Sequence, residues 1–142
     1  MDVRTPLMAR AMADAGAGLL ALPLGELPDI ASVQLMAERP EGLAVRLQLS
    51  AGNTGDAVAA LLAWADAMTD PAASGRECEE YIRVEVTGLV GGVRITVWDH
   101  LRGPDLNDTG CFLSLPLDGD THRLPLGVLR ALARHRAERA DA

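Results

Sequence analysis

The chain has 142 residues, of which 49% are hydrophobic and 23% are charged, so it is long enough for one domain with its own core and too short for two ordinary domains. This composition excludes an intrinsically disordered chain, a collagen-like fibre and a disulfide-rich miniprotein. The formal net charge of -7 disfavours nucleic acid and membranes as partners, and the absence of lysine excludes reactions that need a primary amine side chain.

The two cysteines, Cys78 and Cys111, lie far apart in the sequence. This usage predicts reduced thiols in a cytoplasmic protein, and the alternative is one disulfide between them. No apolar run approaches the ~18 residues that a membrane span requires, so we expect no membrane segment. Scarce isoleucine, asparagine and phenylalanine beside abundant alanine, leucine, glycine and arginine favour a bacterial, high-GC genome.

The first predicted helix begins at Thr5-Pro6, a capping residue followed by proline, and ends before Pro23. Gly16 and Gly18 weaken its interior. One apolar face follows from residues that recur at steps of three and four, namely Met8, Met12, Ala15, Leu19 and Leu22.

The segment from Ile30 to Ser50 alternates with period two and is predicted to form a β-hairpin. Its turn is Arg39-Pro40-Glu41-Gly42. Arg46 lies on the polar face of this hairpin. The apolar face contains Val33, Leu35, Ala37, Leu43, Val45, Leu47 and Leu49.

A second helix is predicted from Ala57 to Met68, capped by Asn53 or Thr54. It is apolar nearly all round, so it requires burial on two sides. We therefore predict a homodimer that covers it, and the alternative is coverage by the first and last helices. The residues expected at the dimer interface are Val58, Leu61, Leu62, Trp64 and Met68. Asp70-Pro71 ends the helix, and residues 72–78 are predicted to be a linker.

A second hairpin is predicted around the two-residue turn Gly91-Gly92. This turn sets Val86 opposite Val97, which directs the apolar rows of both strands to one face. The polar face pairs Arg83 with His100, Glu85 with Trp98 and Thr87 with Thr96. We expect a protein-interaction surface there, made by Arg83, Glu85, Arg94, Trp98 and His100. The alternative is that another helix layer or a fifth strand covers Trp98.

The rest of the chain is predicted to contain a loop over 102–110, an additional fifth strand over Cys111–Leu115, and a final helix. That helix begins near Pro125, buries Leu126, Leu129, Leu132 and Ala133, and carries arginines toward its end. The predicted fold class is α+β, one domain spanning 1–142, with three helices and an antiparallel sheet of two hairpins plus the fifth strand.

The predicted order, α-β-β-α-β-β-(β)-α, is similar to that of the secretion-chaperone-like fold. The members of that fold are small, acidic and usually dimeric. The resemblance is one of arrangement at the level of the fold, and it spans most of the chain.

No pattern of catalytic residues stands out, so no catalytic residue is predicted and the chain is interpreted as non-enzymatic. Cys78, His100, Cys111 and His122 lack the short spacing of a zinc site, and we predict neither a metal nor another cofactor. We expect a homodimeric adaptor, chaperone-like or regulatory protein with an unidentified protein partner. The alternatives are a small-molecule-binding domain or small enzyme with a pocket between sheet and helices, and a DNA-linked regulator that uses the arginines of the final helix.

Overall fold

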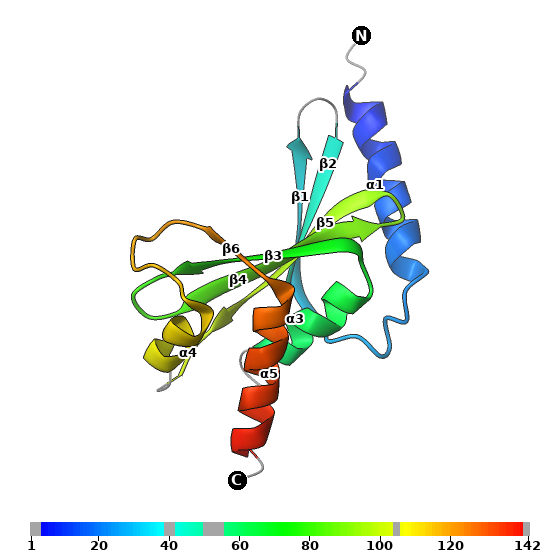
Figure 1. Cartoon of the computed structure of the whole chain (residues 1–142). Coiled ribbons are helices and arrows are strands. Elements are labelled where there is room, and N and C mark those ends of the chain that lie inside the picture. The colour runs from blue at the N-terminus through cyan, green and yellow to red at the C-terminus, as the bar shows by residue number, and fades with distance from the viewer. Residues whose placement is uncertain (1–3, 39–41, 50–55, 104–105, 141–142) are drawn as a thin grey trace.

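The computed structural model describes residues 4–38, 42–49, 56–103 and 106–140. These residues form an α+β fold with four helices and one mixed sheet of six strands, ordered β1-β2-β5-β4-β3-β6 (Figure 1). The elements along the chain are α1 (Arg4–Leu20), β1 (Ile30–Glu38), β2 (Gly42–Leu49), α3 (Ala57–Asp66), β3 (Thr69–Glu77), β4 (Ile82–Val90), β5 (Val93–Leu101), α4 (Leu106–Leu113), β6 (His122–Leu124) and α5 (Leu126–Ala140).

The β4–β5 hairpin has the predicted register. Val86 pairs with Val97, and Gly91 and Gly92 have φ of 59° and 80°, which a primed two-residue turn requires. The hydroxyl oxygens of the neighbouring pair Thr87 and Thr96 lie 2.9 Å apart and form a hydrogen bond across the strands. Ile82, Val84, Val86, Ile95 and Val97 are fully buried and Val93 is partly buried, so this hairpin supplies the centre of the core.

The β1–β2 hairpin is also antiparallel as predicted, with Val33 opposite Leu47 and Leu35 opposite Val45. Its predicted turn at residues 39–41 lies outside the described residues. The expectation of one buried apolar face is only half right. Leu47 and Val45 are buried, whereas Val33 is 59% and Leu35 is 42% exposed, because β1 is the sheet edge and α1 packs on β2, β4 and β5.

The prediction of a purely antiparallel sheet is wrong, because β2 and β5 pair in parallel. Val45 lies beside Ile95 and Leu47 beside Val97 in this ladder. A parallel pair needs a long connection between its strands. Here the connection passes through α3, β3 and β4, so the two predicted hairpins join into one sheet with a shared buried face.

Residues 72–78, predicted to be a linker, instead belong largely to β3, which lies between β4 and β6. The strand was missed because its inward positions carry small residues in place of β-branched ones. At Gly75 an added Cβ would lie 2.8 Å from Leu124 Cδ1 and 3.2 Å from Leu115 Cδ1. The space that a strand side chain would fill is occupied by these leucines from the following segment.

The predicted fifth strand at Cys111–Leu115 is also wrong, since that stretch contains the end of α4. Thr109, Gly110 and Leu113 are the buried residues of α4, a spacing that fits a helix better than a strand. Short apolar runs do not distinguish the two by periodicity alone. The sixth strand, β6, has only three residues and follows a turn through Gly119, so no sequence pattern marks it.

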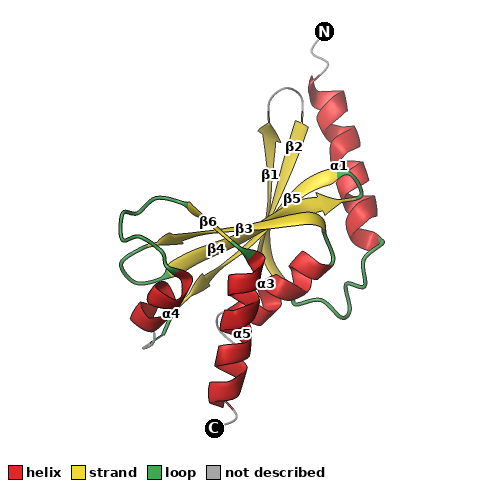
Figure 2. Cartoon of the chain, in the orientation of Figure 1, coloured by secondary structure: helices red, strands yellow, loops and turns green. Residues whose placement is uncertain are grey.

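Helix α3 is buried on two sides within one chain. It packs on the sheet through β2, β3, β4 and β5 and also contacts α5, as Figure 2 shows. Asp56 caps it by accepting a hydrogen bond from the Val58 amide at 3.0 Å; the predicted caps Asn53 and Thr54 lie outside the described residues. Trp64 Nε1 donates to the Pro28 carbonyl at 3.2 Å. None of the described helices combines the length and the apolar character needed to cross a membrane.

The five residues expected at a dimer interface are all buried inside the single chain. The sheet and α5 therefore account for their burial without a second copy. The predicted coverage by the last helix agrees with the observed α3–α5 contact. The five residues are Val58, Leu61, Leu62, Trp64 and Met68.

Helix α1 approaches the β4–β5 turn closely through a glycine. It begins at Arg4, one residue before the predicted cap Thr5, and ends at Leu20. An added Cβ at Gly18 would lie 3.1 Å from the Val90 carbonyl oxygen and 3.2 Å from Gly91 Cα. Gly18 therefore permits a backbone contact that any side chain would disturb.

Two glycine substitutions in α1 test this contact. Gly16 has nothing within 4 Å of an added Cβ, so Gly16→Ala should raise the free energy of unfolding by about 0.5–1 kcal/mol through helix propensity. Gly18→Ala should instead lower it by about 1–3 kcal/mol through overpacking against the turn. Urea unfolding measures both changes, and equal stabilisation by the two variants would contradict the docking of α1 on the turn.

Candidate functional site

The face of the sheet opposite the core carries a polar cluster, which we name the arginine–aromatic face. On β4 and β5, residues of this face alternate with fully buried core residues, and most of them are half-buried or exposed. All five residues predicted for an interaction surface, Arg83, Glu85, Arg94, Trp98 and His100, lie on it. The arginine–aromatic face consists of Arg46, Arg76, Arg83, Glu85, Arg94, Trp98 and His100.

The sheet register sets basic side chains directly beside one another. Arg76 on β3 lies opposite Arg83 on β4, and Arg83 in turn lies opposite His100 on β5. Like charges that face each other across strands destabilise a sheet. Arg76 and Arg83 are therefore a local concentration of positive charge within an acidic chain, and His100 continues the row as an imidazole.

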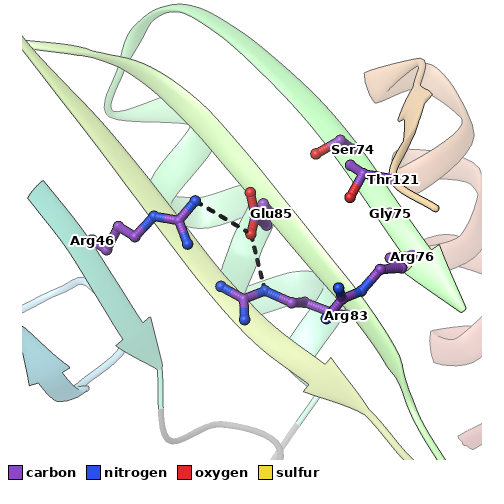
Figure 3. A pocket seen from close by; sticks show the side chains of 7 residues that line it. All are labelled: Arg46, Ser74, Gly75, Arg76, Arg83, Glu85 and Thr121. Atoms are coloured by element: carbon purple, nitrogen blue, oxygen red, sulfur yellow. Dashed lines mark hydrogen bonds and ion pairs between the residues drawn. The ribbon is translucent and has the colours of Figure 1, made fainter. Parts of the chain in front are cut away.

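Glu85 is the carboxylate at the centre of the face. Its Oε1 lies 2.9 Å from Arg83 Nε and 3.9 Å from Arg46 Nη2. Figure 3 marks both contacts with dashed lines. One carboxylate thus faces two guanidinium groups. Arg76 Nε is buried and has no hydrogen-bond partner within the described segments, which leaves a donor unsatisfied at a cost of about 1–3 kcal/mol.

Trp98 is half-buried beneath charged and aromatic neighbours. The Arg83 guanidinium lies 3.9 Å from the Trp98 ring centroid, within the range of a cation–π interaction. His100 meets the Trp98 ring edge-on at 5.0 Å and packs against Tyr81 at 4.2 Å between ring centroids. The sequence prediction that this tryptophan lies on the polar face is confirmed, although it is less exposed than expected.

Burial lowers the pKa of His100 below its usual value of 6.5, and the nearby positive charges of Arg102, Arg83 and Arg76 lower it further. Asp99 acts in the opposite direction. The imidazole is therefore harder to protonate in the folded protein than in the unfolded chain.

A cavity of about 390 Å³ opens on this face between β2, β3 and β4 and the segment before β6. It lies outside the sheet, unlike the predicted pocket between sheet and helices. Figure 3 shows the side chains of Arg46, Arg83 and Glu85 directed toward one another beside it. The cavity is lined by Arg46, Ser74, Gly75, Arg76, Arg83, Glu85 and Thr121.

Sequence reasoning missed three polar residues that line this cavity. Ser74 and Arg76 belong to β3, which was interpreted as a linker, and Thr121 precedes the unpredicted β6. Arg46 was placed correctly on the polar face of its hairpin, but only the parallel β2–β5 pairing brings it near Glu85. The alternation of Ala73 and Gly75 with polar neighbours was the one available signal for β3.

The other candidate residues form no comparable cluster. Cys78 and Cys111 are both free, as predicted. No group of three or more histidine, cysteine or acidic residues in the described ranges is arranged to hold a metal ion. His122 Nε2 contacts the Asp118 carboxylate at 2.9 Å, and this hydrogen bond lowers the pKa of Asp118.

Two arginines of the basic helix α5 contact acids at the ends of α3. Arg130 Nη2 lies 2.8 Å from Asp66 Oδ1, and Arg136 Nη1 lies 3.2 Å from Asp56 Oδ1. These contacts join α5 to the two ends of α3.

Comparison of the chain with models of known protein families, with curated proteins and with solved structures gives no match. The similarity to the secretion-chaperone-like fold therefore stays a prediction.

The lowered pKa of His100 predicts a pH dependence of stability. The unfolded chain binds this proton more readily, so the free energy of unfolding should fall as the pH drops below about 6.5 and level off below the folded-state pKa. His100→Gln should show a weaker fall between pH 7.5 and 5.5 in urea unfolding. A direct check is the NMR titration of His100, whose pKa should rise partway toward 6.5 in Arg102→Gln. An unchanged pH dependence in His100→Gln would contradict the assignment.

Proposed function

We propose that this chain is a non-enzymatic protein-interaction module that binds its partner through the arginine–aromatic face. The observation that carries the proposal is the position of Trp98, which stacks on Arg83 on the side of the sheet away from the core. Tryptophan and arginine are enriched among residues that dominate binding energy. A large ring with one hydrogen-bond donor offers much contact area at little entropic cost.

The sheet beneath this face supports binding because it is rigid. Val84, Val86 and Val97 alternate with the face residues and are fully buried. The backbone that holds Arg83, Glu85 and Trp98 is thus fixed by core packing before any partner arrives. Preorganisation lowers the entropic cost of association. An adaptor, chaperone-like or regulatory role in the cytoplasm is the setting we propose, and the free thiols support a reducing compartment.

Substitution of the two tryptophans separates a binding role of Trp98 from a packing role. Trp64→Ala should cost about 3–5 kcal/mol of stability, since Trp64 is 1% exposed. Trp98→Ala should cost clearly less and should weaken partner binding by about 2 kcal/mol or more. Thermal and urea unfolding test the first point, and titration of the partner captured from the native host tests the second.

The matched control for binding is Leu117→Ala, which changes an 83% exposed side chain in the loop before β6. It should leave both stability and binding unchanged. A stability loss in Trp98→Ala as large as that in Trp64→Ala would make Trp98 a core residue and contradict the proposed function.

Self-association is a second part of the proposal, with an interface different from the one first expected. Strand β1 is a nine-residue sheet edge that exposes Val33, Leu35 and Met36, and α1 exposes Leu7 and Met12. Long apolar edges favour pairing with another strand. We propose that a homodimer forms through β1 and α1.

Light scattering at micromolar concentration should show twice the 15.0 kDa mass of one chain. Leu35→Glu should convert this species to the monomer, because it places a charge on the exposed edge. Leu117→Glu, which adds the same charge in a loop, should not. A wild-type protein that scatters as a 15.0 kDa species contradicts the homodimer.

A second candidate function, binding of a small anionic molecule, is favoured by the cavity of about 390 Å³ beside three arginines. A DNA-linked role has less support, because the chain is acidic and Arg130 and Arg136 of α5 contact acids of the same chain.

A further inference from the structure

We propose that the cavity beside Arg46, Arg76 and Arg83 is an oxyanion site, which accepts a carboxylate or phosphate group carried by an acidic segment of the partner protein. This inference rests on the proposed function, since it names the chemistry by which the arginine–aromatic face recognises its partner. The cavity lies at one end of that face, next to the row formed by Arg76, Arg83 and His100.

The charge balance of the cavity favours an anion. Three guanidinium groups line it, and Glu85 is the one carboxylate among its lining residues. Glu85 contacts Arg83 at 2.9 Å and reaches Arg46 only at 3.9 Å. The lining therefore keeps an excess of positive charge that a bound oxyanion would neutralise.

The hydrogen-bond donors of the cavity are also incompletely used. Arg76 Nε is buried with no partner among the residues that the structure describes. Buried donors are nearly always paired, so this unpaired one is a destabilising feature that the residues lining the cavity retain. Ser74 and Thr121 add hydroxyl groups to the same lining. Guanidinium and hydroxyl donors that converge on one space fit a carboxylate or phosphate group.

The placement of these arginines on neighbouring strands lowers the stability of the sheet. Arg76 and Arg83 are directly opposite cross-strand neighbours, and Arg83 is followed by His100 on the next strand. Repulsion across strands would be relieved by a neutral residue at either arginine position. A bound anion turns the same repulsion into a favourable contact for both side chains.

The volume of the cavity limits the size of the group that can bind in it. About 390 Å³ accommodates an acidic or phosphorylated side chain with part of its backbone, at the lower end of the range for ligand pockets. The rest of an acidic segment would then lie along the open face, toward Trp98 and His100. The Arg83 guanidinium, 3.9 Å from the Trp98 ring centroid, links the two parts of the face.

Inorganic sulfate is the first probe, because its charge does not change between pH 5 and 8. Calorimetric titration of the whole chain should show one site, and Trp98 fluorescence should change as Arg83 shifts over the ring. Arg76→Gln should weaken sulfate binding about tenfold, the loss of one charge-assisted hydrogen bond. Glu85→Gln should strengthen it several-fold, because the competing carboxylate is removed.

Opposite effects of these two variants distinguish an anion site from a general loss of structure. Arg134→Gln on the exposed side of α5 is the matched charge control and should bind sulfate like the wild type. Trp98→Phe should abolish the fluorescence change and retain the heat of binding. Absence of sulfate binding, or equal binding by wild type and Arg76→Gln, overturns the proposal.

Peptides then identify the source of the oxyanion. Short peptides rich in glutamate, peptides with one phosphoserine, and glutamine-substituted controls are titrated against the same variants. Binding of either anionic peptide, weakened by Arg76→Gln, supports the proposal and tells carboxylate from phosphate. Sulfate binding without peptide binding assigns the site to a small free anion and overturns the polypeptide source.

The results that would contradict the oxyanion site differ from those that would contradict the proposed function. If Trp98→Ala abolishes partner binding while Arg76→Gln has no effect on any anion, the interaction surface stands and the oxyanion site is wrong. If Arg76→Gln weakens sulfate binding and Trp98→Ala leaves partner binding intact, the anion site stands and the proposed docking of the partner through Trp98 is wrong.

Discussion

The parallel pairing of β2 with β5 is the contact on which the sheet and its outer face both depend. Each of the two hairpins has its own apolar row, and the ladder from Val45↔Ile95 to Gln48↔Trp98 brings these rows into one buried layer under α3. The same ladder determines the outer side. It places Arg46 beside Thr96, from where its guanidinium reaches Glu85 on β4. A shift by one residue would turn Arg46 into the core, so the register that builds the core also builds the site.

The two faces of the sheet contribute to stability in opposite ways. The inner face gains stability from apolar burial, and its small residues fit around large neighbours: Gly88, for example, leaves space for Met68, which would lie 2.7 Å from an added Cβ. The outer face retains arrangements that oppose stability, including the Arg76–Arg83 pair and the unpaired Arg76 Nε. Structural features that cost stability while the rest of the fold is well packed are concentrated where a protein binds or reacts.

The sequence predicted those elements whose local chemistry determines their geometry. The Gly91-Gly92 turn allows one register, so the facing pairs of β4 and β5 and the common side of Arg83, Glu85, Arg94, Trp98 and His100 followed from the sequence. Strands β3 and β6 were missed because their pairing depends on distant partners: β3 is recognisable only once Leu115 and Leu124 are seen above Gly75. The site was accordingly half predicted. Its aromatic end lies on one hairpin, whereas its arginine end requires three separate segments, β2, β3 and β4.

The contact between Gly18 and Gly91 joins positions that are separated by about half of the chain. On the ribosome, α1 is synthesised before the turn that it rests on, which appears only about 70 residues later. Until then Met8, Leu19 and the other partly buried residues of α1 have no core to pack against. The buried row of β2 likewise has no neighbouring strand on that side until β5 has been synthesised. Folding of this chain is therefore dominated by non-local contacts, which slows it and leaves the N-terminal third with exposed apolar surface during synthesis.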